Sequence, residues 1–240
     1  MKHFYLYLFI SFTFLCLSEG QSKVDVFNFN QSGELRTIYQ QSIFINDLYS
    51  SSLDAGSYLG IGTNVWTRWG FRGNVQRKLS YRSAIELGFM YNHIKYETKT
   101  SQEYRPHQAY HFNFPIVGNS VIKHRFRLEE RLFAKNEIDN RYFSSRLRYR
   151  IYNKGRLNGQ AVHPKTCYYR IFAEWNFNVY SDTSDNFFLR GRYSIGYGYQ
   201  FNTRFSADAN YIYEHNNVEG SNKQVIMHIF HFSLRHTIRL

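Results

Sequence analysis

Charged and apolar residues alternate along the segment Lys123–Phe133, which reads KHRFRLEERLF. In a helix these charges would spread around the whole circumference, because successive residues are rotated by about 100°. In a strand, successive side chains point to opposite faces, so the charges share one face and the apolar residues share the other. The pattern therefore predicts a strand with one charged face and one apolar face.

The same alternation recurs from Leu35 to the end of the sequence, in segments separated by turn-like stretches. Their length and spacing are typical of tilted membrane strands. No helical pattern lies between them. The ten predicted strands are Leu35–Asn46, Tyr58–Phe71, Arg82–Tyr91, Glu103–Phe114, Lys123–Phe133, Tyr142–Tyr152, Tyr168–Tyr180, Phe187–Gln200, Arg204–Tyr213 and His228–Leu240.

Two architectures can use such strands. A soluble sandwich or lipocalin-like barrel would bury the aromatic faces and expose the charges. The long in-phase segments and the apolar C-terminal strand instead favour a membrane barrel. In a membrane the sheet has to close, because every backbone hydrogen bond must be satisfied. We therefore predict an all-β fold, a closed antiparallel transmembrane β-barrel of about ten strands, with apolar faces toward lipid and charges toward the interior.

Composition supports this prediction, since the chain holds 21 Tyr and 22 Phe but only 3 Pro. Membrane barrels concentrate aromatic residues in interfacial girdles. At the N-terminus, Lys2 and His3 precede the apolar run Phe4–Leu17, a pattern typical of a secretory signal peptide cleaved after Gly20. The predicted organisation is a signal peptide at 1–20, an N-terminal segment at 21–34 and a barrel domain at 35–240.

An even strand number would place both ends of the barrel domain on the periplasmic side. The connections Ser181–Asn186 and Asn216–Gln224 would then be extracellular, and Phe201–Asn202 would be a tight periplasmic turn. The longest late connection, Asn153–Thr166, would also be periplasmic, although periplasmic turns are usually short.

The segments EYRPHQAY, KHRFRLEERLF and SSRLRYRIY, in this order, resemble an uncharacterised outer-membrane barrel family of Gram-negative bacteria, a domain of unknown function. AEWNFNV and RGRYSIGYGYQF fit its later strands, so the resemblance covers about Leu59 to Leu240. Its most specific parts are Arg105–Pro106 and the pattern of Arg125, Arg127 and Glu129. The resemblance implies a barrel fold and an outer-membrane location, and it supplies no substrate and no catalytic residues.

Inward-facing charge is the main functional signal. It allows a salt-bridged plug, because a ten-stranded barrel is only a little wider than the eight-stranded barrels that side chains fill. It also allows a small anion-selective pore, because excess arginine along a pore favours anions. The predicted lumen residues are Glu103, Arg105, Arg125, Arg127, Glu129, Arg131, Arg146, Arg148, Arg150, Glu174, Arg190, Arg192, Asp208 and Glu214.

Catalytic signals are weak. His107 and Glu103 share a face but are too far apart along the strand to form a pair. His93, His111 and His124 have no serine or carboxylate at a recognisable spacing. We therefore predict no catalytic residues. The alternative is an outer-membrane barrel hydrolase or acyl-modifying enzyme, which convergence of a histidine, a serine and a carboxylate at one rim would favour.

Metal and cofactor signals are weaker still. After cleavage of the signal peptide Cys167 is the only cysteine, and His228, His231 and His236 alternate between the faces of one strand. We therefore predict no metal site and no cofactor.

The net charge of +12 with interleaved aromatics could suggest nucleic acid as a partner. An export signal and arginines enclosed in a barrel argue against it. The expected partners are outer-membrane lipid, anionic lipopolysaccharide and the barrel-assembly machinery, since the apolar C-terminal strand resembles an assembly signal although it ends in Leu240.

Overall fold

The computed structural model describes residues 30–62, 65–114, 120–135, 141–158, 164–182, 186–217 and 224–240. The predicted signal peptide at 1–20 lies outside the described residues. Within the described ranges, no helix has the length and apolar character needed to cross a membrane.

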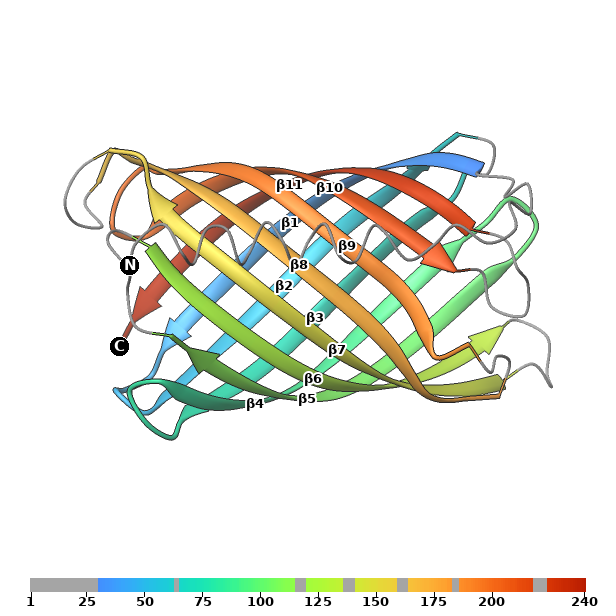
Figure 1. Cartoon of the computed structure of the whole chain (residues 1–240), viewed down its shortest axis with the longest axis horizontal. Helices are drawn as coiled ribbons and strands as arrows, with labels where there is room; N and C mark the ends of the chain where they lie inside the picture. Colours follow the sequence, from blue (N-terminus) through green and yellow to red (C-terminus); the bar gives the residue numbers. More distant parts are fainter. Residues whose placement is uncertain are drawn as a thin grey trace, which may run out of the picture.

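In the described part of the chain, eleven tilted strands close into a single barrel (Figure 1). Each strand lies beside its predecessor in the wall. The strands are β1 (Asn30–Phe44), β2 (Tyr49–Ile61), β3 (Thr67–Lys78), β4 (Ser83–Lys95), β5 (Thr100–Asn113), β6 (Ser120–Lys135), β7 (Arg141–Arg156), β8 (Thr166–Ser181), β9 (Phe188–Gln200), β10 (Phe205–Asn217) and β11 (Gln224–Arg239).

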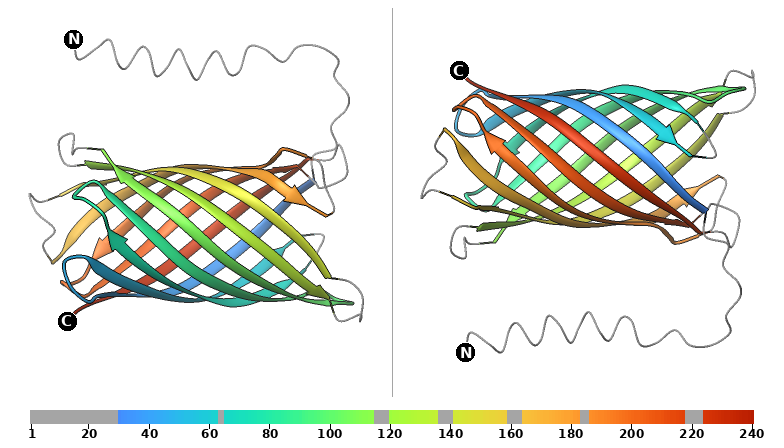
Figure 2. Two further views of the ribbon diagram at one scale, coloured as in Figure 1. Left: turned by 90° about the horizontal axis from the view of Figure 1, so that it is seen from below. Right: turned by 90° about the horizontal axis from the view of Figure 1, so that it is seen from above.

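The barrel closes through a parallel pair, whereas all other neighbouring strands are antiparallel. β1 pairs with β11 from Asn30 opposite Val225 to Phe44 opposite Arg239, and the two strands lie side by side in the right-hand view of Figure 2. Because the strand number is odd, β1 begins at one end of the barrel and β11 finishes at the other. The predicted even number, with both ends of the barrel domain on one side, is therefore wrong.

The additional strand comes from the predicted strand Tyr58–Phe71, which is in fact two strands. β2 stops at Ile61, and Gly62 adopts a φ of 126°, a conformation that favours glycine. The amide of Gly60 donates to the carbonyl of Trp66 at 2.8 Å and closes the hairpin before β3. The first half of β2 reads YSSSLDAG, and its serines and glycine hide the alternation.

The other nine predicted strands each overlap one observed strand, with shifted ends. β1 starts at Asn30, inside the stretch predicted to precede the barrel. We call the end at which β11 finishes the C-terminal end of the barrel. β7 and β9 end at this end of the barrel, whereas β8 and β10 end at the opposite end, which agrees with the relative arrangement predicted from the sequence.

Side-chain polarity is inverted relative to a soluble barrel. Every strand exposes at least one large hydrophobic residue on the outer surface, among them Leu87 at 64% exposure and Ile195 at 61%. Among the described residues, twenty-five buried side chains are polar or charged and only seven are hydrophobic. The aromatic and aliphatic rows thus lie outside and the charges lie inside, opposite to the arrangement of a lipocalin-like barrel.

Candidate functional site

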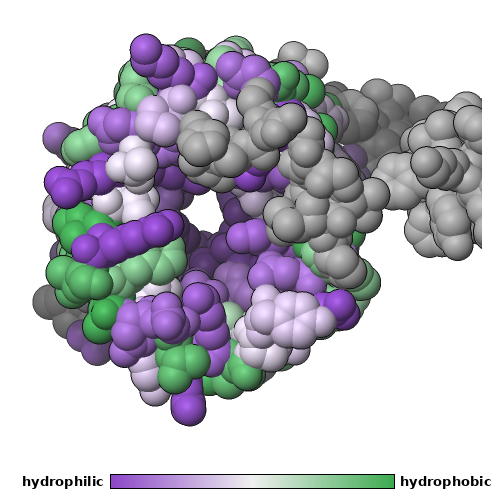
Figure 3. All heavy atoms as spheres, turned by 90° about the vertical axis from the view of Figure 1, so that its left-hand side faces the viewer, coloured by the Kyte–Doolittle hydropathy of each residue, from purple (hydrophilic) through white to green (hydrophobic). Residues whose placement is uncertain are grey.

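The interior of the barrel is hollow. A cavity of about 900 Å³ is lined by residues from β1 through β11, and the view along the axis from the C-terminal end shows a central opening framed by hydrophilic residues (Figure 3). A second cavity of about 380 Å³ lies among β1 to β6. Gln40 and Lys123 line both cavities, so the two adjoin.

The structure brings all fourteen predicted lumen residues together inside the barrel. Each of them takes part in an ion pair between arginine and carboxylate. The alternation that placed them on one face of their strands also explains the grouping, because the inward faces of all strands converge on one axis.

Seven of these residues form a continuous chain of ion pairs, which we call the ion-pair ladder. Arg105, Arg148 and Arg192 each contact two carboxylates and so bridge them. For example, Arg105 Nη2 lies 2.7 Å from Glu103 Oε1, and Arg148 Nη2 lies 2.6 Å from Glu174 Oε1. The ladder crosses six neighbouring strands from β5 to β10 and so fixes their register. In order, it consists of Glu103, Arg105, Glu129, Arg148, Glu174, Arg192 and Glu214.

The two central carboxylates of the ladder, Glu129 and Glu174, are fully buried. A buried charge is costly unless several charge-assisted hydrogen bonds compensate it. Each of the two meets this condition with four arginines. Glu129 contacts Arg105, Arg127, Arg146 and Arg148, and Glu174 contacts Arg125, Arg148, Arg150 and Arg192.

Eight further charged residues of the lumen were not predicted. They follow the same alternation. Glu34, Arg36 and Asp54 lie on β1 and β2, where the pattern is weak or was missed, whereas Glu86, Arg170 and Arg235 lie on the inward face of strands that were predicted, where the alternation could have identified them. The eight residues form smaller groups of ion pairs. Arg36 and Arg68 pair with Glu34, Arg72 pairs with Asp54, Arg127 pairs with Glu86, and Arg170 and Arg235 pair with Asp208.

Positive charge prevails in the lumen. Across the described residues, fourteen arginines share eight carboxylates in these ion pairs, an excess of six positive charges. Lys123 adds another charge to the cavity wall, and no ion pair is recorded for it within the described ranges.

The histidines have structural neighbours. His107 Nε2 lies 2.8 Å from Asn74 Oδ1 and 3.5 Å from Glu86 Oε1, while His111 Nε2 lies 3.2 Å from Glu86 Oε2. Glu103, which shares a face with His107 in the sequence, contacts Arg105 and Arg131 instead.

On the outer surface, His93 stacks on Trp69 with ring centroids 5.3 Å apart, and His124 Nδ1 lies 2.8 Å from the Tyr149 hydroxyl. Among the described histidines, none has a recorded hydrogen bond to a serine.

No group of three or more histidine, cysteine, aspartate or glutamate side chains that could hold a metal ion occurs in the described part of the chain. His228 and His236 contact the hydroxyls of Tyr211 and Tyr39. His231 lines the large cavity, on the other face of the same strand. Cys167 is a free thiol next to the hydroxyl of Tyr197.

Comparison with known proteins gives one assignment. No curated protein gives a significant match to the chain. A family model described as "Protein of unknown function (DUF2490)" matches residues 37–225. The match begins in β1 and ends in β11, so it covers the barrel and reaches further toward the N-terminus than the sequence resemblance did. The chain therefore belongs to this uncharacterised family.

Proposed function

We propose that the chain is an integral outer-membrane β-barrel whose arginine-rich lumen conducts small anions. The observation that carries the proposal is the inverted polarity, with large hydrophobic residues on the outside of every strand and paired charges within.

The outer surface supports the membrane location. Soluble monomers rarely expose apolar patches larger than a few hundred Å², whereas here the exposed apolar residues occur on all eleven strands. Contact with lipid would remove this surface from water, at a gain of about 25 cal/mol per Å². A closed barrel also leaves no unpaired strand edge in the hydrocarbon.

The lumen supports anion conduction over a plug. The argument for a plug assumed ten strands, and an eleventh strand widens the barrel. The ion-pair ladder follows neighbouring strands along the wall, and a cavity of about 900 Å³ remains beside it. Excess arginine around such a passage attracts anions.

Conductance in planar lipid bilayers tests this proposal. Purified protein should open discrete channels, and in a KCl gradient the reversal potential should show a preference for chloride. Lys123→Glu changes the charge where the two cavities adjoin, so it should shift the selectivity toward cations. Arg204→Glu, in the exposed β9–β10 turn, should leave the selectivity unchanged. Absence of channels, or a cation preference of the unaltered protein, would refute anion conduction.

A structural barrel without transport is the second candidate. It is favoured by the complete enclosure of Glu129 and Glu174 among arginines, a feature that rigidifies the wall. Folded protein that inserts into bilayers without any discrete conductance would select this candidate.

A non-enzymatic role follows from either candidate. The alternative of a barrel hydrolase predicts turnover of lipid, peptide or ester substrates by the folded protein. We expect all three to survive incubation, and turnover of any of them would replace the present proposal.

The proposed partners are outer-membrane lipid and the machinery that inserts barrels. Lys95, Lys99 and Arg141 are exposed at the end opposite the C-terminal end, where they could face anionic lipopolysaccharide. Reversal of these charges should weaken binding of lipopolysaccharide, and unchanged binding would exclude this contact.

A further inference from the structure

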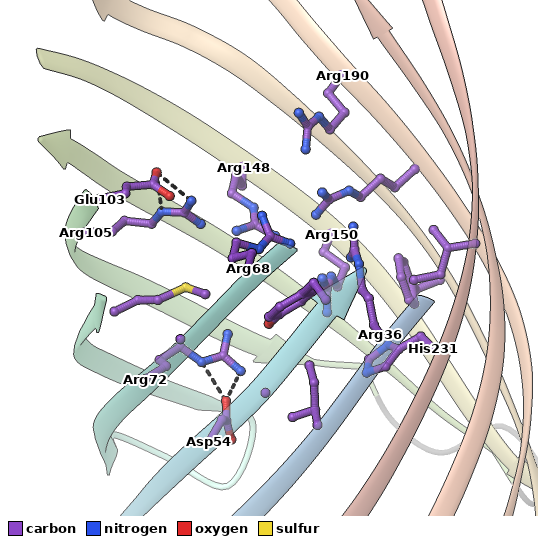
Figure 4. A pocket seen from close by; sticks show the side chains of 18 of the residues that line it. Arg36, Asp54, Arg68, Arg72, Glu103, Arg105, Arg148, Arg150, Arg190 and His231 are labelled. Atoms are coloured by element: carbon purple, nitrogen blue, oxygen red, sulfur yellow. Dashed lines mark hydrogen bonds and ion pairs between the residues drawn. The ribbon is translucent and has the colours of Figure 1, made fainter. Parts of the chain in front are cut away.

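Three positive charges occupy adjacent inward positions on β6 and β7. Arg125 lies directly opposite Arg150 in the register of the two strands, and Lys123 follows at the next inward position of β6, opposite Tyr152. Lys123, Arg125 and Arg150 all line the large cavity, and Figure 4 shows Arg150 directed into the lumen. We call these three residues the cationic block.

The register places the three side chains within reach of one small ligand. Opposite residues of an antiparallel pair have Cα atoms about 4.5–5.5 Å apart, and alternate residues of a strand lie about 6.5–7 Å apart. Lys123 and Arg150 are diagonal neighbours, a separation that long side chains span. Arg125 Nη2 and Arg150 Nε already meet at a single atom, because they lie 3.0 Å and 2.6 Å from the same oxygen, Glu174 Oε2.

The cationic block carries more positive charge than the neighbouring carboxylates compensate. Among the described residues, Glu174 is the one carboxylate in a recorded ion pair with Arg125 or Arg150, and it also pairs with two further arginines. Lys123 has no recorded ion pair in the same ranges. Three positive charges therefore share at most one negative charge, which leaves an excess of two.

This arrangement is unfavourable without a ligand. Arg125 and Arg150 are direct cross-strand partners, and like charges in such positions destabilise a sheet. Arg125 is also repelled by the positive charges of Arg127 and Arg148, and its Nε is buried without a hydrogen-bond partner in the part of the chain that the structure describes. An anion bound in front of the block would replace repulsion with attraction.

The block offers ordered donors to the cavity. Arg150 binds Glu174 through Nε alone, no partner is recorded for its two terminal nitrogens within the described ranges, and its side chain is 26% exposed. Its guanidinium carbon lies 4.5 Å from the ring centroid of Phe172, a cation–π contact that stabilises one orientation. Binding to an already ordered group loses less conformational entropy. Lys123 is exposed where the two cavities adjoin.

We propose that Lys123, Arg125 and Arg150 bind a doubly charged tetrahedral oxyanion, either inorganic phosphate or sulfate. The charge of such an ion matches the excess of two positive charges, and its oxygens can accept hydrogen bonds from guanidinium and ammonium groups at the same time. Chloride offers a single charge and a single atom. The inference rests on the proposed function, because the ion has to reach the block through the open lumen.

Each member of the block can be replaced without leaving a carboxylate unpaired. Without Arg125 or Arg150, Glu174 keeps Arg148 at 2.6 Å. Replacement of Lys123 breaks no ion pair recorded in the described ranges. Lys123→Gln, Arg125→Gln and Arg150→Gln should therefore preserve the barrel, which heat-modifiable migration on gels checks.

Isothermal titration calorimetry of the purified barrel in detergent provides the test, with sulfate and inorganic phosphate titrated separately and chloride as the reference anion. The unaltered protein should bind at least one of the two ions saturably, and the comparison shows which ion the block prefers. Each of the three glutamine variants should weaken this binding by about tenfold or more, the size expected for lost charge-assisted hydrogen bonds.

Two further variants separate the block from the rest of the lumen. Arg190→Gln removes a positive charge from the same cavity but outside the block, and Glu214 keeps Arg192. This variant should bind the oxyanion as the unaltered protein does. Lys123→Arg keeps the positive charge, so it should retain the binding that Lys123→Gln loses. The pair of Lys123 variants decides the matter if an arginine variant fails to fold.

Three results would overturn the inference. The first is a lack of saturable binding of both sulfate and phosphate by the unaltered protein. The second is full binding by the folded glutamine variants of the block. The third is an equal loss of binding in Arg190→Gln, which would assign the effect to the overall charge of the lumen.

The two proposals fail in different ways. Oxyanion binding without discrete conductance would refute the anion pore and retain the site. Anion-selective conductance without oxyanion binding would refute the site and retain the pore.

Discussion

The ion-pair ladder on β5 to β10 is densely charged, whereas part of the wall on β1 to β3 is polar but uncharged. We call this second region the neutral patch. In the ladder, Glu129 and Glu174 each contact four arginines. In the patch, Asn74 Nδ2 donates to Ser52 Oγ at 3.0 Å. The neutral patch consists of Gln40, Ser42, Ser50, Ser52, Asn74 and Gln76, all of which line the second cavity.

In both regions every second side chain is polar and points inward, but the side chains of the ladder are longer than those of the patch. Long arginines connect carboxylates across several strands and fix the register of the ladder, while short serines leave open space in front of the patch. The second cavity, in front of the neutral patch, is thus a consequence of small side chains, whereas the ladder is held rigid by long paired ones. An inward polar face alone does not determine whether a barrel is filled.

The ladder should be the more sensitive region to loss of a single charge. Glu174→Gln leaves Arg125, Arg148, Arg150 and Arg192 without their shared carboxylate. Breaking a buried ion pair by removing one partner costs about 3–5 kcal/mol. Urea unfolding in lipid vesicles, followed by tryptophan fluorescence, should show a loss of stability in this range. A loss below 1 kcal/mol would show that the ladder does not stabilise the wall.

Substitutions on the outer surface behind the ladder and behind the neutral patch should have similar effects on stability. Val75 lies on the outer surface behind the neutral patch and is 55% exposed, and Ile195 lies on the outer surface of β9. An arginine on the lipid face near the bilayer centre costs about 2–4 kcal/mol. Val75→Arg and Ile195→Arg should therefore each destabilise the barrel in vesicles, by up to this amount at the midplane and by less toward the end of a strand.

A water-soluble barrel would respond differently to the same two variants. An exposed surface substitution in a water-soluble protein typically changes stability by less than about 0.5 kcal/mol. If both variants were neutral in vesicles as well, the outer surface would not contact hydrocarbon.

The sequence predicted the ladder far better than the patch, for a physical reason. Strong alternation between arginine and aromatic residues identifies both faces of β6 to β9, and all seven ladder residues were predicted. The segment YSSSLDAG lacks a large apolar face, so β2 and Asp54 were missed. The turn signal Gly62-Thr63-Asn64 inside the predicted strand could have revealed the hairpin.

Even where the inward face of a strand was predicted correctly, the sequence did not show which charged residues pair with each other. Alternation tells which side of the sheet a residue occupies, but partners depend on the stagger between strands. Arg125 on β6, for example, reaches past β7 to Glu174 on β8 at 3.0 Å. Whether the lumen is open also depended on the strand number, which the missed β2 changed.

Steric fit should limit the neighbourhood of the neutral patch more than charge does. A Cβ atom at Gly88 would collide with the side chains of Asn74 and His107, which hydrogen-bond to each other. Gly88→Ala should therefore destabilise the barrel by about 1–3 kcal/mol, the usual cost of overpacking. Gly73→Ala is the matched control, because its Cβ would meet Leu53 at an ordinary 3.4 Å. Equal stability of the two variants would contradict a steric role for Gly88.

Hydrogen bonding within the patch should matter least. Ser52→Ala removes the acceptor of Asn74 Nδ2, while Asn74 Oδ1 keeps its contact with His107. A neutral hydrogen bond contributes about 0.5–1.5 kcal/mol to stability. The adjoining cavity of about 380 Å³ gives water access to the freed donor. The expected loss of stability is therefore at the low end of this range. The same urea titration should show this small loss. A loss as large as that of Glu174→Gln would mean that the patch supports the barrel as strongly as the ladder does, and that open space in the lumen is unrelated to how tightly its wall is bound.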